Sequence, residues 1–91
     1  MSTEVELEEE IAVDSKTASG KNLVIYNDDY NTFDHVIDSL VKVCEHEIVQ
    51  AEQCTWIIHY NGKCAVKEGD MDKLVPMRRA LSERGIDAKI H

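Results

Sequence analysis

One stretch of this chain constrains its fold more than any other. A short apolar run over residues 23–26 stops abruptly at three polar residues, Asn27, Asp28 and Asp29. Apolar residues then recur at helical spacing from Phe33 onward. A strand, an acidic loop and a helix N-terminus therefore meet at one point. Loops held between rigid elements are where functional residues concentrate.

The acidic loop has two open interpretations. It presents amide and carboxylate oxygens without a matching run of Lys or Arg, and such acceptors suit a bound cation or a hydrogen-bond donor. The plainer alternative is a solvated turn that caps a helix, because Asn and Asp favour turns for local backbone reasons. The loop alone does not decide between them.

The pattern of apolar residues predicts a strand followed by two helices. Residues 21–26 are typical of a strand, and Thr32 is placed to cap the first helix. The apolar face of that helix is predicted to consist of Phe33, Val36, Ile37, Leu40, Val41 and Cys44. A second helix is predicted over about residues 48–60, with Asn61-Gly62 as its stop. The residues predicted to share one face of this helix are Ile48, Ala51, Cys54, Thr55 and Ile58.

The C-terminal third predicts a strand, a helix and a last strand. The strands are expected over residues 63–68 and 86–90, and the helical stretch between them ends at Gly85. Pro76 lies within that stretch, so either the helix begins near residues 73–75 or it is kinked. The order β-α-α-β-α-β predicts an α+β fold in one small domain. Its three-stranded sheet, antiparallel or mixed, would be covered on one face by three helices.

Residues 1–20 differ from the rest in composition. They are acidic and contain no aromatic residue, so they bury too little apolar surface to offset the entropy of ordering them. We therefore predict a disordered acidic tail over residues 1–20 and a folded core over residues 21–91. Solubility and a tether or handle for another machine are both open roles for the tail.

The charge of the chain limits its partners. A formal net charge of -8 over 91 residues argues against a nucleic-acid surface, which needs clustered Lys and Arg. No segment approaches the roughly twenty apolar residues that span a bilayer, and no signal-peptide pattern is present. We expect a cytoplasmic monomer that binds cationic or neutral partners, with no nucleic acid and no membrane.

The cysteines predict core thiols. The chain has three, which cannot all pair with one another: Cys44, Cys54 and Cys64. Each lies in an apolar stretch, so reduced thiols in the core are expected. Zinc is the sharper alternative because histidines are interspersed with them, namely His35, His46 and His59. The spacings match no compact zinc motif, so we predict neither a metal nor a cofactor.

A more specific pattern joins the acidic loop to the end of the second predicted helix. The string LVIYNDDYNTF over residues 23–33 is followed by Val36-Ile37, then by AEQ over residues 51–53 and IIHYNGK over residues 57–63. Together these strings resemble the ClpS family, the adaptors that deliver N-degron substrates to the Clp AAA+ protease. The resemblance covers the chain from about residue 21 to its end. NDDY after a strand, paired with HxxGK after a helix, is far more specific than either motif alone.

The resemblance implies a binding site for the first residue of a substrate, when that residue is bulky and hydrophobic (Leu, Phe, Tyr or Trp). Asn27, Asp28 and His59 match the positions that hold the substrate's α-ammonium, which has donors only and needs acceptors. His59 must then be neutral at its accepting nitrogen. Asp29 and Asn31 match the rim of the pocket. The walls of the hydrophobic pocket match Phe33, Val36, Thr55 and Ile58.

Several positions depart from the family's usual residues. Thr55 stands where Met is common, and that Met gates the pocket against β-branched first residues. An altered or relaxed side-chain preference is therefore a hypothesis for this chain. Asn31 replaces a usual Thr, Thr32 a usual Pro and Phe33 a usual Met, and a reshaped rim is a second hypothesis for this chain.

The resemblance also implies a partner, the N-terminal domain of a ClpA-type or ClpC-type AAA+ unfoldase. Docking would use an acidic residue and a lysine of the third-helix region. Asp72 matches the acid, and the lysine position falls near Met77 or Arg78.

Two other classes stay open beside this non-enzymatic adaptor. An enzyme would use Asp28, Asp29 and His59 as a metal or acid-base site, but no nucleophile motif or phosphate loop supports it. A plain interaction module, resembling the C-terminal domain of the ribosomal stalk protein, would keep the helices without the pocket.

Overall fold

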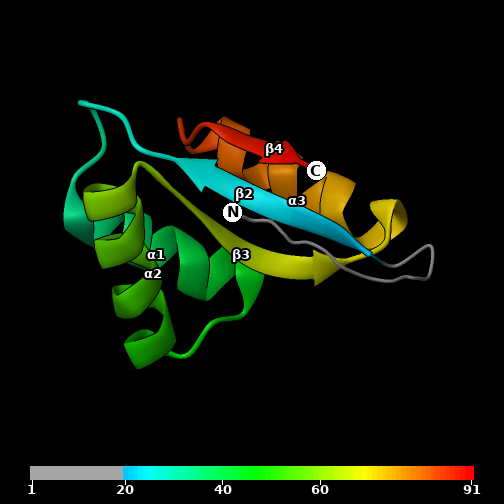
Figure 1. Cartoon of the computed structure of the whole chain (residues 1–91), viewed down its shortest axis with the longest axis horizontal. Coiled ribbons are helices and arrows are strands. Elements are labelled where there is room, and N and C mark those ends of the chain that lie inside the picture. Colours follow the sequence, from blue (N-terminus) through cyan, green and yellow to red (C-terminus); the bar gives the residue numbers. More distant parts are fainter. Residues whose placement is uncertain (1–19) are drawn as a thin grey trace, which may run out of the picture.

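Residues 20–91 are described in the computed structural model and form an antiparallel sheet with three helices (Figure 1). The elements in order are β2 (Lys21–Tyr26), α1 (Phe33–Cys44), α2 (Ile48–Asn61), β3 (Lys63–Gly69), α3 (Met71–Glu83) and β4 (Ala88–Ile90). This confirms the predicted β-α-α-β-α-β order and the α+β class. The tail predicted over residues 1–20 lies outside the described residues except for Gly20.

The central strand, β2, carries the acidic loop at its end. The strand order is β3-β2-β4, and β2 is antiparallel to both neighbours, which settles the choice between an antiparallel and a mixed sheet. Leu23 and Ile25 point to one face of β2 and are fully buried, as expected for residues two apart on a strand. In Figure 1, α1 and α3 lie behind the sheet, and α2 lies beside α1. The loop therefore starts from the best-anchored strand.

Helix α1 begins where its cap was predicted. The Oγ1 of Thr32 accepts a hydrogen bond from the backbone N–H of His35 at 3.1 Å, and Asp34 lies in the first turn, where a negative charge favours the helix dipole. Val36 and Leu40 are buried against the sheet. The start of α1 is thus fixed directly after the loop.

Helix α2 ends at the predicted Asn-Gly stop, with Gly62 in the left-handed conformation at φ 89°. Of the residues predicted to share a face, Ala51, Thr55 and Ile58 are buried. Ile48, the first residue of α2 at the margin of the core, is 63% exposed.

Helix α3 corrects the prediction for Pro76. The helix begins at Met71, where the Oδ1 of Asp70 accepts from the N–H of Lys73 at 3.0 Å, so a start near residues 73–75 is wrong. Pro76 lies inside the helix and removes the bond that its N–H would make to the carbonyl of Asp72. Both residues are exposed, so water can satisfy that carbonyl.

The chain after α3 turns through Gly85, at φ 80°, into Ile86 and β4. The last strand begins at Ala88, two residues later than predicted. Tyr26 still pairs just before it, because its N–H donates to the carbonyl of Asp87 at 3.0 Å. The end of β2 is therefore held on the β4 side up to the acidic loop.

Candidate functional site

The residues that the sequence assigned to substrate binding converge on one cavity of about 280 Å³. It is bounded by the loop, the start of α1 and the last turns of α2. Its lining consists of Asn27, Asp28, Asp29, Asn31, Thr32, Phe33, Val36, Thr55, Ile58 and His59. Every residue assigned to the α-amino group, the rim or the hydrophobic pocket is among them. Thr32, which was predicted as a cap and which replaces a usual Pro of the rim, lines the cavity as well.

A backbone hydrogen bond explains how the two motifs meet. The N–H of Asn27, the first residue of the loop, donates to the carbonyl of Gly62 at 2.8 Å. Gly62 follows α2 and lies three residues after His59. Because β3 pairs with β2 immediately beyond this point, starting at Tyr26 opposite Lys63, the loop and the end of α2 are held side by side.

Asp28 organises the loop. Its Oδ1 accepts from the backbone N–H groups of Tyr30 and Asn31, both at 2.9 Å, and its Oδ2 accepts from the Asn31 carboxamide at 2.6 Å. Burial raises the pKa of Asp28, but the hydrogen bonds from Asn31 and Tyr30 and the nearby His35 lower it, and the net shift is downward. Asp28 is therefore a carboxylate at neutral pH.

Asn31 ties the loop to the end of α3. Its Nδ2 donates to Asp28 Oδ2 and also to the carbonyl of Gly85 at 2.9 Å. Both hydrogens of the carboxamide are thus used, and the side chain bridges the loop and the turn after α3. The resemblance had placed Asn31 at the rim only, and nothing in the sequence indicated the contact with Gly85.

The apolar part of the cavity lies between α1 and α2. Val36, Thr55 and Ile58 are buried, and Phe33 is half-buried. The hydroxyl of Thr55 donates to the carbonyl of Ala51 within α2 at 2.7 Å. Because its hydrogen is used inside the helix, Thr55 lines the cavity without a donor that a ligand must satisfy.

An aromatic cluster continues from the rim of the cavity along α2. The ring of Phe33 meets that of Trp56 edge-on at 4.5 Å between centroids, and His59 lies 6.0 Å from Phe33. Tyr60 stacks on Trp56 at 5.3 Å with 10° between the ring planes. Sequence reasoning missed Trp56 and Tyr60, although their spacing of four residues on α2 was a usable signal.

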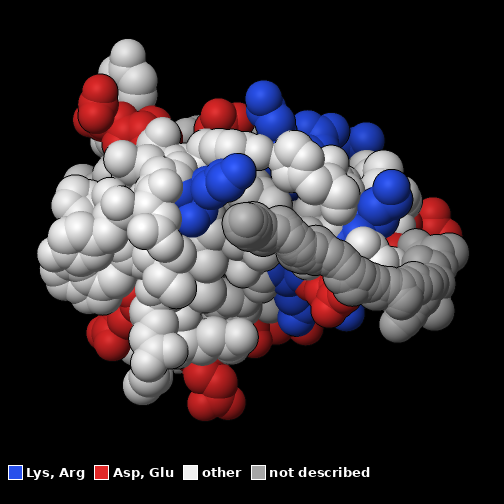
Figure 2. Space-filling model, viewed as in Figure 1, with Lys and Arg blue, Asp and Glu red and all other residues white. Residues whose placement is uncertain are grey.

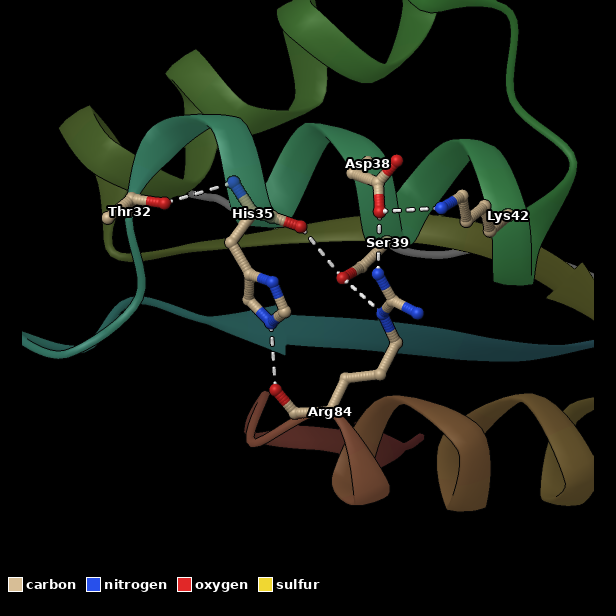
Figure 3. A network of polar contacts seen from close by, with 6 residues as sticks. All are labelled: Thr32, His35, Asp38, Ser39, Lys42 and Arg84. Carbon is tan, nitrogen blue, oxygen red and sulfur yellow. Dashed lines mark hydrogen bonds and ion pairs between the residues drawn. The ribbon is translucent and has the colours of Figure 1, made fainter.

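A polar network holds α1 against the end of α3 beneath the loop (Figure 3). Arg84 reaches α1, where its Nε donates to Ser39 Oγ and its terminal nitrogen donates to Asp38 Oδ2, each at 2.7 Å. The Nε2 of His35 donates to the carbonyl of Arg84 at 2.8 Å. This network positions Gly85, the acceptor for Asn31.

The residues assigned to unfoldase docking lie on α3, outside the lining of the cavity. Asp72 is exposed in the first turn, and Arg78 is partly buried. A separation of six residues puts them roughly 120° apart around the helix. Their assignment as a docking pair stays a prediction.

No group of three or more His, Cys, Asp or Glu side chains within residues 20–91 gathers to hold a metal ion. Burial raises the pKa of both Cys44 and Cys64 to about 11. These thiols are therefore protonated at neutral pH, whereas metals bind the thiolate. None of the helices in this part of the chain is long and apolar enough to cross a membrane.

Comparison with known proteins gives a consistent result. A family model described as "ATP-dependent Clp protease adaptor protein ClpS" matches residues 16–87. The chain is 36% identical over 66 residues to the ATP-dependent Clp protease adapter protein ClpS of Pectobacterium carotovorum subsp. carotovorum (strain PC1), a match that covers 68% of this chain and 62% of that protein. It is 38% identical over 82 residues to the protein of the same name from Serratia proteamaculans (strain 568), covering 85% of this chain and 77% of the relative. The chain thus spans less than two thirds of the first of these relatives.

Proposed function

The chain belongs to the ClpS family of Clp protease adaptors, and from that premise we propose that it recognises the first residue of N-degron substrates. It binds the free α-amino group together with a bulky hydrophobic side chain, that of Leu, Phe, Tyr or Trp. It then delivers the substrate to a ClpA-type or ClpC-type AAA+ unfoldase for degradation. The adaptor itself performs no chemistry.

The observation that carries this proposal is a single cavity with acceptors on one side and apolar walls on the other. Burying a Leu or Phe side chain contributes roughly 1.5 to 3 kcal/mol, and a charge-assisted hydrogen bond contributes about 1.5 to 3 kcal/mol. Micromolar affinity needs about 8 kcal/mol after the costs of association. Neither contribution is sufficient alone, so both ends of the first residue have to be read together.

The contacts of Asp28 limit how it meets an ammonium group. Two N–H groups occupy Oδ1 and one N–H occupies Oδ2, so Oδ2 keeps one lone-pair direction for a ligand. Asn27 and His59, both exposed residues at the cavity, supply the other acceptors. An ammonium with three donors matches three acceptors of this kind.

A peptide pair that differs only in the α-amino group tests this mechanism without altering the protein. We expect a Phe-initiated peptide to bind at least tenfold more tightly than its N-acetylated twin in a fluorescence anisotropy titration, a difference of about 1.4 kcal/mol. An Ala-initiated peptide is the control for the side-chain pocket. Equal affinity for the free and acetylated peptides would falsify amine recognition and favour a plain interaction module.

Variants of the acceptors give a second, independent test. Asn27→Ala and His59→Ala should each weaken the Phe-initiated peptide at least tenfold, with Asn61→Ala, at the exposed end of α2, as the matched control. Asp28→Ala should do so as well, but it also removes three hydrogen bonds within the loop. Its effect therefore counts only if circular dichroism and unfolding curves show an intact fold.

The side-chain preference depends on Thr55. Because Thr is shorter than the usual Met, the pocket has room near the Cβ of the first residue of a bound peptide. We therefore expect weaker discrimination against peptides that begin with a β-branched residue. Titration of peptides that begin with Phe, Leu, Ile and Val measures this directly. Unchanged rejection of Ile and Val would count against the hypothesis, and Thr55→Met should restore rejection where it is lost.

A further inference from the structure

Two exposed aromatic rings stand beside the proposed pocket and have no role in holding a first residue. Trp56 is 48% exposed and Tyr60 is 73% exposed, although both residue types carry large apolar surfaces. They stack on one another along α2. We name this pair of rings the aromatic strip. A flat, exposed strip of this kind is suited to binding a side chain that lies across it.

The strip is continuous with the cavity. The ring centroid of Trp56 lies 4.5 Å from that of Phe33 and 6.2 Å from that of His59. Phe33 and His59 both line the cavity. In an extended peptide, side chains two residues apart point to the same side, roughly 6.5 Å from one another. A peptide that leaves the cavity in the direction of Trp56 therefore brings its third side chain to the strip.

The segment of the chain that carries the strip has more acidic than basic residues. Residues 27–61, which include the loop, α1 and α2, contain seven Asp or Glu residues and one Lys. Glu52 lies four residues before Trp56 on α2, on the same side of the helix. Figure 2 shows Asp and Glu at the upper left and lower left of the molecule as well as at its right-hand end, with one Lys or Arg group left of centre and the others further to the right. A cation over the face of Trp or Tyr is attracted by the ring as well.

We propose that the aromatic strip of Trp56 and Tyr60 is a second subsite, which binds a cationic third residue, above all arginine, of the peptide whose first residue occupies the cavity. This subsite rests on the proposed function, since the peptide must first be anchored by its amino terminus. The planar guanidinium of Arg stacks on aromatic faces and stays charged at neutral pH.

The test is a titration series of Phe-initiated peptides that differ only at the third residue, carrying Arg, its neutral isostere citrulline, Ala or Glu. We expect Arg to bind about two- to fivefold more tightly than Ala. Citrulline should bind less tightly than Arg, and Glu less tightly than Ala. Trp56→Ala should abolish the advantage of Arg over Ala, and the two peptides are compared within the variant because Trp56 also packs against Phe33 of the cavity wall. Trp56→Phe should retain most of that advantage.

Ile57→Ala is the matched control variant. Ile57 is the neighbour of Trp56 and similarly exposed, but it lines a different groove over the sheet. This variant should leave the advantage of Arg unchanged. A peptide with Arg at the sixth position and Ala at the third controls for general attraction to a chain of charge -8.

Several results would overturn the subsite. They are an equal advantage for Arg at the sixth position, an equal affinity for citrulline, or an advantage that survives Trp56→Ala. Failure of the proposed function would give a different result. The Phe-initiated peptide with Ala at its third position would then bind no more tightly than the same peptide with an acetylated N-terminus. Normal discrimination between that pair, with no preference for Arg, overturns the subsite alone.

Discussion

Asn31 shows how much of the loop depends on one carboxamide. Its two hydrogens bind Asp28 Oδ2 and the carbonyl of Gly85. Asn31→Ala should therefore destabilise the fold by about 1 to 2 kcal/mol, because one of the lost bonds is charge-assisted. It should also weaken binding of the Phe-initiated peptide, since Asp28 loses its support. Urea unfolding and the anisotropy titration measure the two effects.

Asn61→Ala is again a suitable control, because an exposed change of this kind stays within about 0.5 kcal/mol. Asn31→Thr, the residue usual in the family, keeps a polar side chain but is too short to bridge Asp28 and Gly85. If Asn31→Ala were as stable as Asn61→Ala, the bridge would contribute nothing.

Asp28 predicts a dependence of stability on pH. Its pKa in the folded chain is lowered below the usual 3.8, against burial, by hydrogen bonds from Asn31 and Tyr30. A lowered folded pKa means that the carboxylate contributes its stability fully above the unfolded value. The contribution is lost as the pH falls through the folded value. The difference in unfolding free energy between the wild type and Asp28→Asn should therefore shrink below about pH 3.8.

Urea unfolding at neutral pH and near pH 3 measures that difference, and Asp29→Asn changes an exposed neighbour as the control. A difference that stays constant down to the lower pH would show that the Asp28 carboxylate does not stabilise the loop.

The sequence predicted single residues well where a local rule applies. Thr32 was identified as a cap because Thr before a helical pattern satisfies a free N–H. The residues of the cavity were identified only through the paired motifs, because Val36 or Ile58 at helical spacing indicates core in any chain. Arg84 was missed, since its partners Ser39 and Asp38 are more than forty residues away and no local pattern marks such a contact.

At the scale of elements, the joint between α1 and the end of α3 supports the site. Arg84→Met removes the bonds to Ser39 and Asp38 and should destabilise the fold by about 1 to 2 kcal/mol. Arg84→Lys should not restore this loss, because an ammonium lacks the two-pronged geometry of guanidinium. Arg79→Met, at an exposed position of α3, is the control. Urea denaturation distinguishes them, and equal midpoints for Arg84→Met and Arg79→Met would contradict a structural role.

The predicted elements differ from the structure where a tertiary contact outweighs a local preference. Pro76 favours a helix start, and a start near residues 73–75 would put it in the first turn. With its cap at Asp70 and Leu74 buried, α3 instead begins at Met71, two to four residues earlier. The last strand is short because Gly85 and Asp87 belong to the turn that holds the end of β2. The spacing of apolar residues in the sequence predicts neither contact.

At the scale of the whole molecule, Asp72 lies on α3 outside the lining of the cavity, so we expect binding and delivery to depend on different residues. Asp72→Ala should leave the affinity for the Phe-initiated peptide unchanged and lower degradation of a Phe-initiated reporter by reconstituted ClpAP or ClpCP at least several fold. Glu83→Ala, at the opposite end of α3, is the matched acidic control. His59→Ala should lose both activities. Unchanged degradation of the reporter with Asp72→Ala would show that the docking surface does not include Asp72.

The position of β2 has a mechanical consequence. It joins the N-terminal residues to the acidic loop, and it is hydrogen-bonded to β3 and β4 at the same time. Tension applied from the N-terminal side runs along this strand, across its hydrogen bonds, which lie perpendicular to it. The bonds share that load in parallel and must break together rather than peel one by one. A motor that pulled on the chain from the N-terminal side of β2 would therefore meet high mechanical resistance at this strand, before the force reached the acidic loop.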